Sequence, residues 1–203
     1  MSASPIGSTA SQNILVIGGL LVALGYLFWM CNALAPEVVP GSSNVTISYA
    51  SLLNYGIATL LLAVGVTALV RSRTFRGASR VGGWLLVAGF LLWAVGAVTG
   101  PMPFRLPWWF LHLSPLCIIF GSALFGIGGF TAGLVNRSGV LLVTVGGALG
   151  MLLIDGPELL WDITGIDLAP STVWRVLGYL LLLVFGLGWI ILGRSRASAY
   201  VRR

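Results

Sequence analysis

The sequence contains no lysine, five acidic residues and a single histidine among 203 residues. Charged residues make up 8% of the chain, whereas a soluble domain carries about 25%. This is too little polar surface to coat a water-soluble globule, so lipid must solvate most of the exterior. The absence of lysine excludes a retinal Schiff base, and one histidine excludes bis-histidine haem ligation within one chain.

Cysteine is scarce as well, and its placement excludes the usual metal sites. Cys31 and Cys117 form neither a CxxC pair nor a metal-ligand spacing. We expect two free, buried thiols, with a disulfide as the alternative. The chain also lacks Walker, HExxH, GxSxG and TVGYG-like motifs. We therefore expect no cofactor and no metal.

Long apolar stretches dominate what is present. Hydrophobic residues make up 58% of the chain, and its mean hydropathy is +1.01. Since one crossing needs about 20 apolar residues, the chain has room for about six. We predict an all-α polytopic membrane bundle of six transmembrane helices that forms one domain over residues 1–203. The expected helices, between short polar tails, are 13–35, 49–70, 81–99, 110–135, 139–154 and 173–193.

Two of these helices leave alternatives open. The first resembles a signal peptide, but no basic residue precedes it and Pro36 follows it, so we expect a retained helix. The fifth is the shortest. It either ends near Ile154 or continues past Pro157 toward Trp161.

Arginine distribution predicts the orientation. With six crossings, nine arginines fall on one side, and all five acidic residues fall on the other. Arginine-rich loops stay in the cytoplasm. We therefore predict a multi-pass protein of the plasma membrane with both termini cytoplasmic. The net charge of +6 reflects this topology, and we expect no nucleic-acid partner.

Part of the chain repeats. GGLLVALGYLFW at 18–29 aligns with GGWLLVAGFLLW at 82–93 without a gap. The even-numbered helices share a glycine at nearly equal distances before an arginine: Gly56 and Arg71, Gly121 and Arg137, Gly178 and Arg194. This pattern predicts three tandem helical hairpins related by an axis near the membrane normal. Chance similarity between apolar helices is the alternative.

Glycine is abundant, at 28 residues, and several glycines have small-xxx-small spacing. In lipid this spacing lets helix backbones approach closely. We expect it to serve packing within the bundle, with a second copy or a membrane protein partner on a glycine-rich face as the alternative. The lipid bilayer is the partner common to both. The pairs are Gly96/Gly100, Gly129/Gly133 and Gly146/Gly150.

Polar groups collect toward the outer ends of the expected helices. Asp155, Glu158 and Asp162 have i, i+3, i+7 spacing, which places them on one helix face. Ionisable groups at a bilayer are costly and mark sites. The alternative is a solvated loop. The candidate outer-face site comprises Asp155, Glu158, Asp162, His112, Arg175, Asn32 and Asn54.

One stretch resembles a known family. NYGIATLLLAVGVTALVR (54–71), GGWLLVAGFLLWAVGAV (82–98), a short proline-containing loop and His112-Leu113 follow one another. This order resembles a prokaryotic six-helix membrane family, domain of unknown function 998. The resemblance implies a six-helix fold and assigns no functional residue.

The sequence names no activity. Our first interpretation is a small non-enzymatic membrane protein with an accessory or assembly role. A small transporter or channel for a cation or small solute would need a polar cavity reaching inward from Asp155. A membrane enzyme with an outer-surface site would need His112 within hydrogen-bond reach of a carboxylate.

Overall fold

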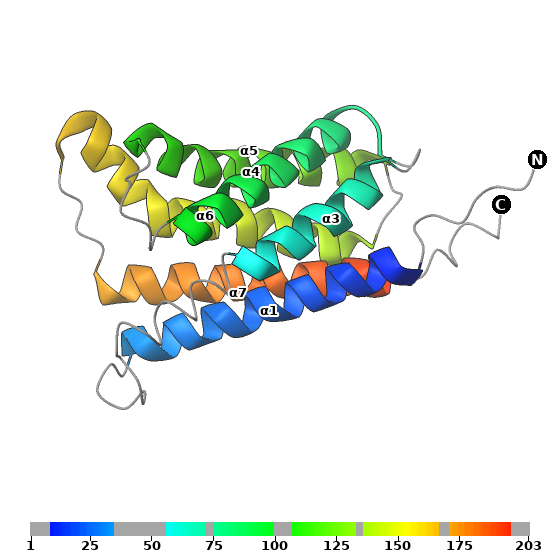
Figure 1. The fold of residues 1–203 in the computed structure, drawn as a ribbon, viewed down its shortest axis with the longest axis horizontal. Coiled ribbons are helices and arrows are strands. Elements are labelled where there is room, and N and C mark those ends of the chain that lie inside the picture. Colours follow the sequence, from blue (N-terminus) through cyan, green and yellow to red (C-terminus); the bar gives the residue numbers. More distant parts are fainter. Residues whose placement is uncertain are drawn as a thin grey trace, which may run out of the picture.

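The computed structural model describes residues 9–34, 56–71, 75–99, 107–132, 136–166 and 171–195. This part of the chain is all-helical, with six helices, as predicted. Figure 1 shows them. Their bounds are α1 (Thr9–Leu34), α3 (Ala58–Arg71), α4 (Ala78–Thr99), α5 (Trp108–Ala132), α6 (Arg137–Thr164) and α7 (Thr172–Arg194).

Five of these helices are long and apolar enough to cross a membrane, and α3 is shorter. The 14 residues of α3 rise about 21 Å, less than the hydrocarbon core of about 30 Å. The expected second span began at residue 49, and residues 49–55 lie outside the described ranges.

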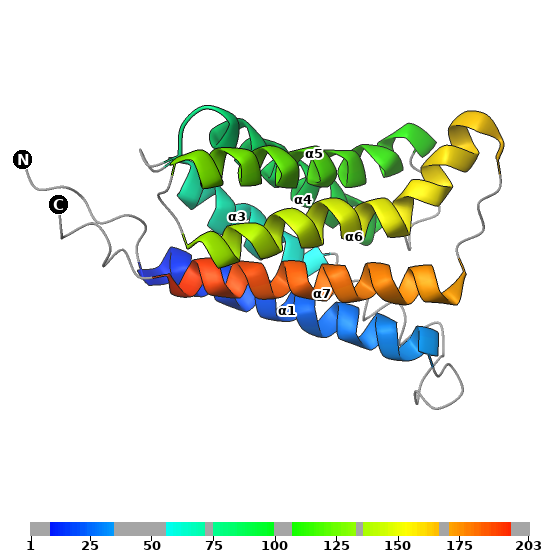
Figure 2. The ribbon, with the colours of Figure 1, turned by 180° about the vertical axis from the view of Figure 1, so that it is seen from behind.

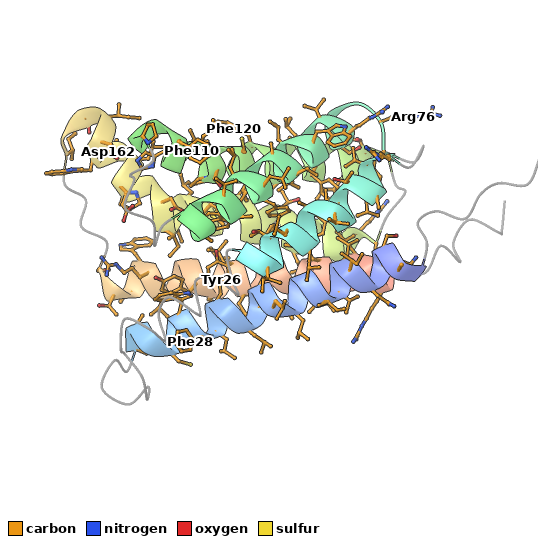
Figure 3. The ribbon with its side chains drawn as sticks, viewed as in Figure 1. Tyr26, Phe28, Arg76, Phe110, Phe120 and Asp162 are labelled. Carbon is orange, nitrogen blue, oxygen red and sulfur yellow. The ribbon has the colours of Figure 1, made fainter. Side chains whose placement is uncertain are left out.

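The six helices form a closed ring in chain order. Each helix packs against the next, and α7 packs against α1. Figures 1 and 2 show α1 and α7 side by side from both faces. We call the two ends of the bundle the acidic end, with Asp155, Glu158 and Asp162, and the arginine end, with Arg71, Arg76, Arg80, Arg137 and Arg194. In Figure 3, Asp162 and Arg76 mark these opposite ends.

Aromatic side chains fill the middle of the ring. Trp189 of α7 lies 6.2 Å from Phe90 of α4 and 5.8 Å from Phe125 of α5, measured between ring centroids. Phe185 lies 5.9 Å from Trp189. All four side chains are at most 1% exposed. Because α4 and α7 are not neighbours in the ring, these residues bridge its interior, and we call them the aromatic plug.

The exterior is apolar as well. Exposed large hydrophobic residues follow helical spacing along each helix, as Ile17, Leu20, Leu24 and Leu27 do on α1. A helix that is apolar both toward its neighbours and toward its surroundings is typical of a membrane span. The bundle is therefore compatible with a multi-pass membrane protein whose outer face contacts lipid.

Glycines bring neighbouring backbones into contact. A Cβ atom placed on Gly82 of α4 would lie 2.6 Å from the carbonyl oxygen of Gly121 on α5. The same 2.6 Å separates a Cβ on Gly146 from Leu181 O, and a Cβ on Gly19 from Gly186 O. No side chain fits at such a distance, so glycine is required at these crossings.

The small-xxx-small pair Gly146/Gly150 serves packing within the chain. A Cβ on Gly150 would meet Leu182 of α7, on the same side as the contact of Gly146. Gly129 faces Val140 of α6, whereas no atom of the described residues lies within 4 Å of a Cβ on Gly96. Their partners Gly100 and Gly133 lie outside the described residues.

Helix α6 is the longest and extends the acidic end. The side chain of Asn136 accepts hydrogen bonds from two backbone N–H groups at its start, and Gly165, with φ +71°, ends it. The helix continues through Pro157 to Thr164, so the continuation past Pro157 is the alternative observed. Proline lacks the N–H that would bond Leu153 O and bends a helix there. Figures 1 and 2 show the last turns of α6 inclined toward the start of α5.

Candidate functional site

Two helices bring charged residues to a similar depth at the acidic end. Asp155 follows Arg137 by 18 residues on α6, and Arg175 precedes Arg194 by 19 residues on α7. At 1.5 Å per residue, both lie about 27–29 Å from the arginine end, close to the far edge of a hydrocarbon core of about 30 Å. The site therefore lies at headgroup level if the arginines mark the near edge.

His112 and Asp162 connect α5 to the inclined end of α6. The distance between His112 Nε2 and Asp162 Oδ2 is 2.5 Å. An ionised carboxylate only accepts hydrogen bonds, so Nε2 carries the proton and donates it. The histidine is 12% exposed and the aspartate 36%. Figure 3 shows Asp162 beside the start of α5, where Phe110 lies. This contact joins the start of α5 to the end of α6.

Asp155 lies deeper than the other two carboxylates. Its Oδ2 atom is enclosed by protein and has no hydrogen-bond partner in the described part of the chain. Asp155 is within electrostatic range of Glu158 and His112. A buried acceptor without a partner costs about 1–3 kcal/mol, and more when it is charged. Such an atom needs a partner that is not part of these helices.

Tyr179 of α7 lies near the charges of this end. Its hydroxyl is within electrostatic range of Arg175, Asp155 and Glu158. Its ring stacks on Tyr26 of α1, with centroids 6.2 Å apart and planes inclined by 28°. Arg175 forms no ion pair with any carboxylate of the described residues. Arg175 and the carboxylates of Asp155 and Glu158 are therefore all near Tyr179, but they form no ion pair with one another among the described residues.

The remaining predicted site residues divide into two groups. Glu158 is exposed near Asp155, on the same helix. Asn54 lies outside the described residues, and Asn32 lies in α1 with a side chain that is also outside them. Sequence reasoning missed Tyr179. The available signal was its position one turn after Arg175, which places both on one face of α7.

The cysteines are both free, as expected, but Cys31 is exposed. Cys117 is half-buried, so the expectation of burial was wrong for Cys31 and held only in part for Cys117. Cys31 lies on the outward face of α1 together with Leu27 and Leu34, which are 40% and 61% exposed. Within the described ranges, no group of three histidine, cysteine or acidic residues could hold a metal ion.

Exposed tryptophans surround the acidic end. Trp161 of α6 and Trp174 of α7 are 50% and 51% exposed. Tryptophan gathers where the hydrocarbon core meets the headgroups. These side chains therefore support a headgroup-level position for the neighbouring carboxylates and for Arg175.

The geometry limits the chemistry. The His112–Asp162 pair meets the hydrogen-bond criterion for a general base, but a base also needs a group to activate. The nearest hydroxyl in sequence, Ser114, donates to Gly89 O at 2.8 Å. Residues two apart on a helix do not face each other, so Ser114 is not positioned as a nucleophile.

These features together define the class, a helical bundle compatible with a multi-pass membrane protein that gathers its carboxylates at one end. No family model, curated protein or solved structure matches the chain.

Proposed function

We propose that the chain is a non-enzymatic accessory or assembly protein of the plasma membrane, with an outward binding site and no permeation path. The aromatic plug carries this proposal. Phe90, Phe125, Phe185 and Trp189 occupy the interior between the two ends at no more than 1% exposure. A channel or transporter would need a polar route past this level.

The buried hydroxyls support the same conclusion. Thr59 donates to Gly56 O at 3.1 Å, and Thr144 donates to Val140 O at 2.8 Å. Both hydroxyls therefore donate to backbone carbonyl groups three or four residues earlier in the chain. Ser122 is buried without a hydrogen-bond partner in the described part of the chain. The Nε1 atom of Trp189 is likewise buried without an acceptor there. One hydroxyl and one indole do not make a conducting chain of polar groups.

The proposal includes six crossings built from three tandem hairpins. A third glycine pair supports it, because Gly146-Gly147 follows Gly82-Gly83 by 64 residues, and Gly82-Gly83 follows Gly18-Gly19 by the same interval. The first glycine of each pair faces the next helix of the ring, at Leu62, Gly121 and Leu181. The resemblance to domain of unknown function 998 belongs to this proposal, since that family also has six helices.

The orientation can be tested with single cysteines. Ser171 and Ser138 are exposed at the acidic and arginine ends. In a background with Cys31→Ser and Cys117→Ser, we expect a membrane-impermeant maleimide to label Ser171→Cys in intact cells. It should label Ser138→Cys only after permeabilisation. Labelling of Ser138→Cys in intact cells would contradict cytoplasmic termini.

The absence of transport can be tested in proteoliposomes. We expect uptake of protons and of radioactive sodium to equal that of protein-free vesicles, because the aromatic plug closes the interior. A protonophore added at the end supplies the full proton signal as a control. Uptake above background that is lost in Asp155→Asn would overturn the proposal and favour the transporter alternative.

A further inference from the structure

The acidic end contains two features that its own residues leave unpaired. The enclosed Oδ2 atom of Asp155 has no hydrogen-bond donor in the described part of the chain. Arg175 has no carboxylate partner there. Both groups are within electrostatic range of the same residue, Tyr179. A ligand that satisfies both must carry a positively charged hydrogen-bond donor and an anionic group.

The balance of charge identifies the donor. In the described part of this end, the basic side chains are Arg175 and His112, and the acidic ones are Asp155, Glu158 and Asp162. His112 is already bonded to Asp162. Asp155 and Glu158 form no ion pair within the described residues, and a carboxylate oxygen favours a cation with N–H groups. A primary ammonium meets this requirement, whereas a quaternary ammonium cannot donate.

The anionic group follows from Arg175. A guanidinium presents several N–H donors in a planar arrangement that matches the oxygens of a phosphate. Exposed Trp161 and Trp174 at the same end favour a position among lipid headgroups.

We propose that the acidic end binds the phosphoethanolamine headgroup of a membrane lipid. Its ammonium donates to Asp155 and Glu158, and Arg175 donates to its phosphate. Tyr179 separates the two charges and contacts the linker between them. The inference rests on the proposed function only in placing the acidic end at one membrane surface.

The test compares lipids that differ in the donor alone. The purified protein is exchanged into nanodiscs of phosphatidylglycerol mixed equally with phosphatidylethanolamine or with phosphatidylcholine, and native mass spectrometry measures the lipid retained. We expect retention of phosphatidylethanolamine about tenfold above phosphatidylcholine, as one charge-assisted hydrogen bond provides. Equal retention of the two lipids would overturn the proposal, and this comparison needs no variant.

Variants then locate the site. Asp155→Asn and Arg175→Gln should each remove most of the preference for phosphatidylethanolamine. Arg194→Gln, at the other end of α7, is the matched control and should retain it. A preference that survives both acidic-end substitutions would place lipid binding elsewhere and contradict the assignment.

A last arm separates a lipid from a free solute. Soluble phosphoethanolamine, added to protein in phosphatidylglycerol nanodiscs, should leave the thermal midpoint unchanged at concentrations below those of the lipid headgroups. A rise equal to that produced by phosphatidylethanolamine would overturn the lipid source. If the protein shows no preference between the two lipids and no ion uptake, the headgroup site is rejected and the proposed function stands. If it shows ion uptake, the proposed function is rejected, whichever lipid is retained.

Discussion

Replacing Gly82 by alanine is expected to destabilise the bundle by about 1–3 kcal/mol or more, because overpacking forces backbones apart. The new Cβ atom would lie 2.6 Å from the carbonyl oxygen of Gly121 and 2.8 Å from the carbonyl carbon of Leu124. Both atoms belong to the α5 backbone, so no side-chain rotation relieves the contact. The helices α4 and α5 must separate, and the neighbouring contacts of Leu86 must change with them.

The same helix offers a matched control. A Cβ on Gly96 would meet no atom of the described residues within 4 Å, and alanine is about 1 kcal/mol better than glycine inside a helix. Gly96→Ala should therefore leave stability unchanged or raise it. Unfolding in detergent, followed by tryptophan fluorescence as sodium dodecyl sulfate is increased, measures both variants. Equal midpoints for Gly82→Ala and Gly96→Ala would contradict the close α4–α5 crossing.

Trp189→Ala is expected to have the largest effect of any single truncation, about 3–5 kcal/mol. Trp189 is fully buried and contacts Phe90, Phe125 and Phe185. Its removal leaves a cavity where α4, α5 and α7 meet. Inside a membrane this loss is mainly one of van der Waals contact, since lipid offers the helices no hydrophobic drive to associate.

Trp189→Phe distinguishes packing from hydrogen bonding. The indole Nε1 of Trp189 has no acceptor in the described part of the chain, so phenylalanine loses volume but no hydrogen bond. We expect Trp189→Phe to retain most of the stability that Trp189→Ala loses, measured by the same unfolding assay. A phenylalanine variant as unstable as the alanine variant would indicate a polar role for the indole that the aromatic plug does not explain.

The helices could be predicted from hydropathy, because stretches such as 81–99 are continuously apolar and bounded by arginine or proline. The extension of α6 could not be settled, since Asp155, Glu158 and Asp162 lower the hydropathy while the helix continues through Pro157. A helix C-cap at Gly165 was the local signal that could have favoured the longer helix.

The interior was harder to predict than the helices. On α4, Phe90 is fully buried and the next residue, Leu91, is 45% exposed. Both are apolar, so periodicity does not separate core from lipid-facing positions as it does in a soluble protein. The acidic spacing did predict that three carboxylates share an end. The pairing of His112 with Asp162, and the position of Tyr179, required the packing of α5, α6 and α7.

The contact of α7 with α1 has a consequence for biosynthesis. Helices enter the membrane in chain order, yet Gly19 of the first helix packs against Gly186 of the last, and Gly193 packs against Gln12. Until α7 is released from the ribosome, one flank of α1 has only lipid or the insertion machinery beside it. The final helix therefore completes the ring of helices. A chain that stops before α7 would keep the α7-facing side of α1 without its protein neighbour.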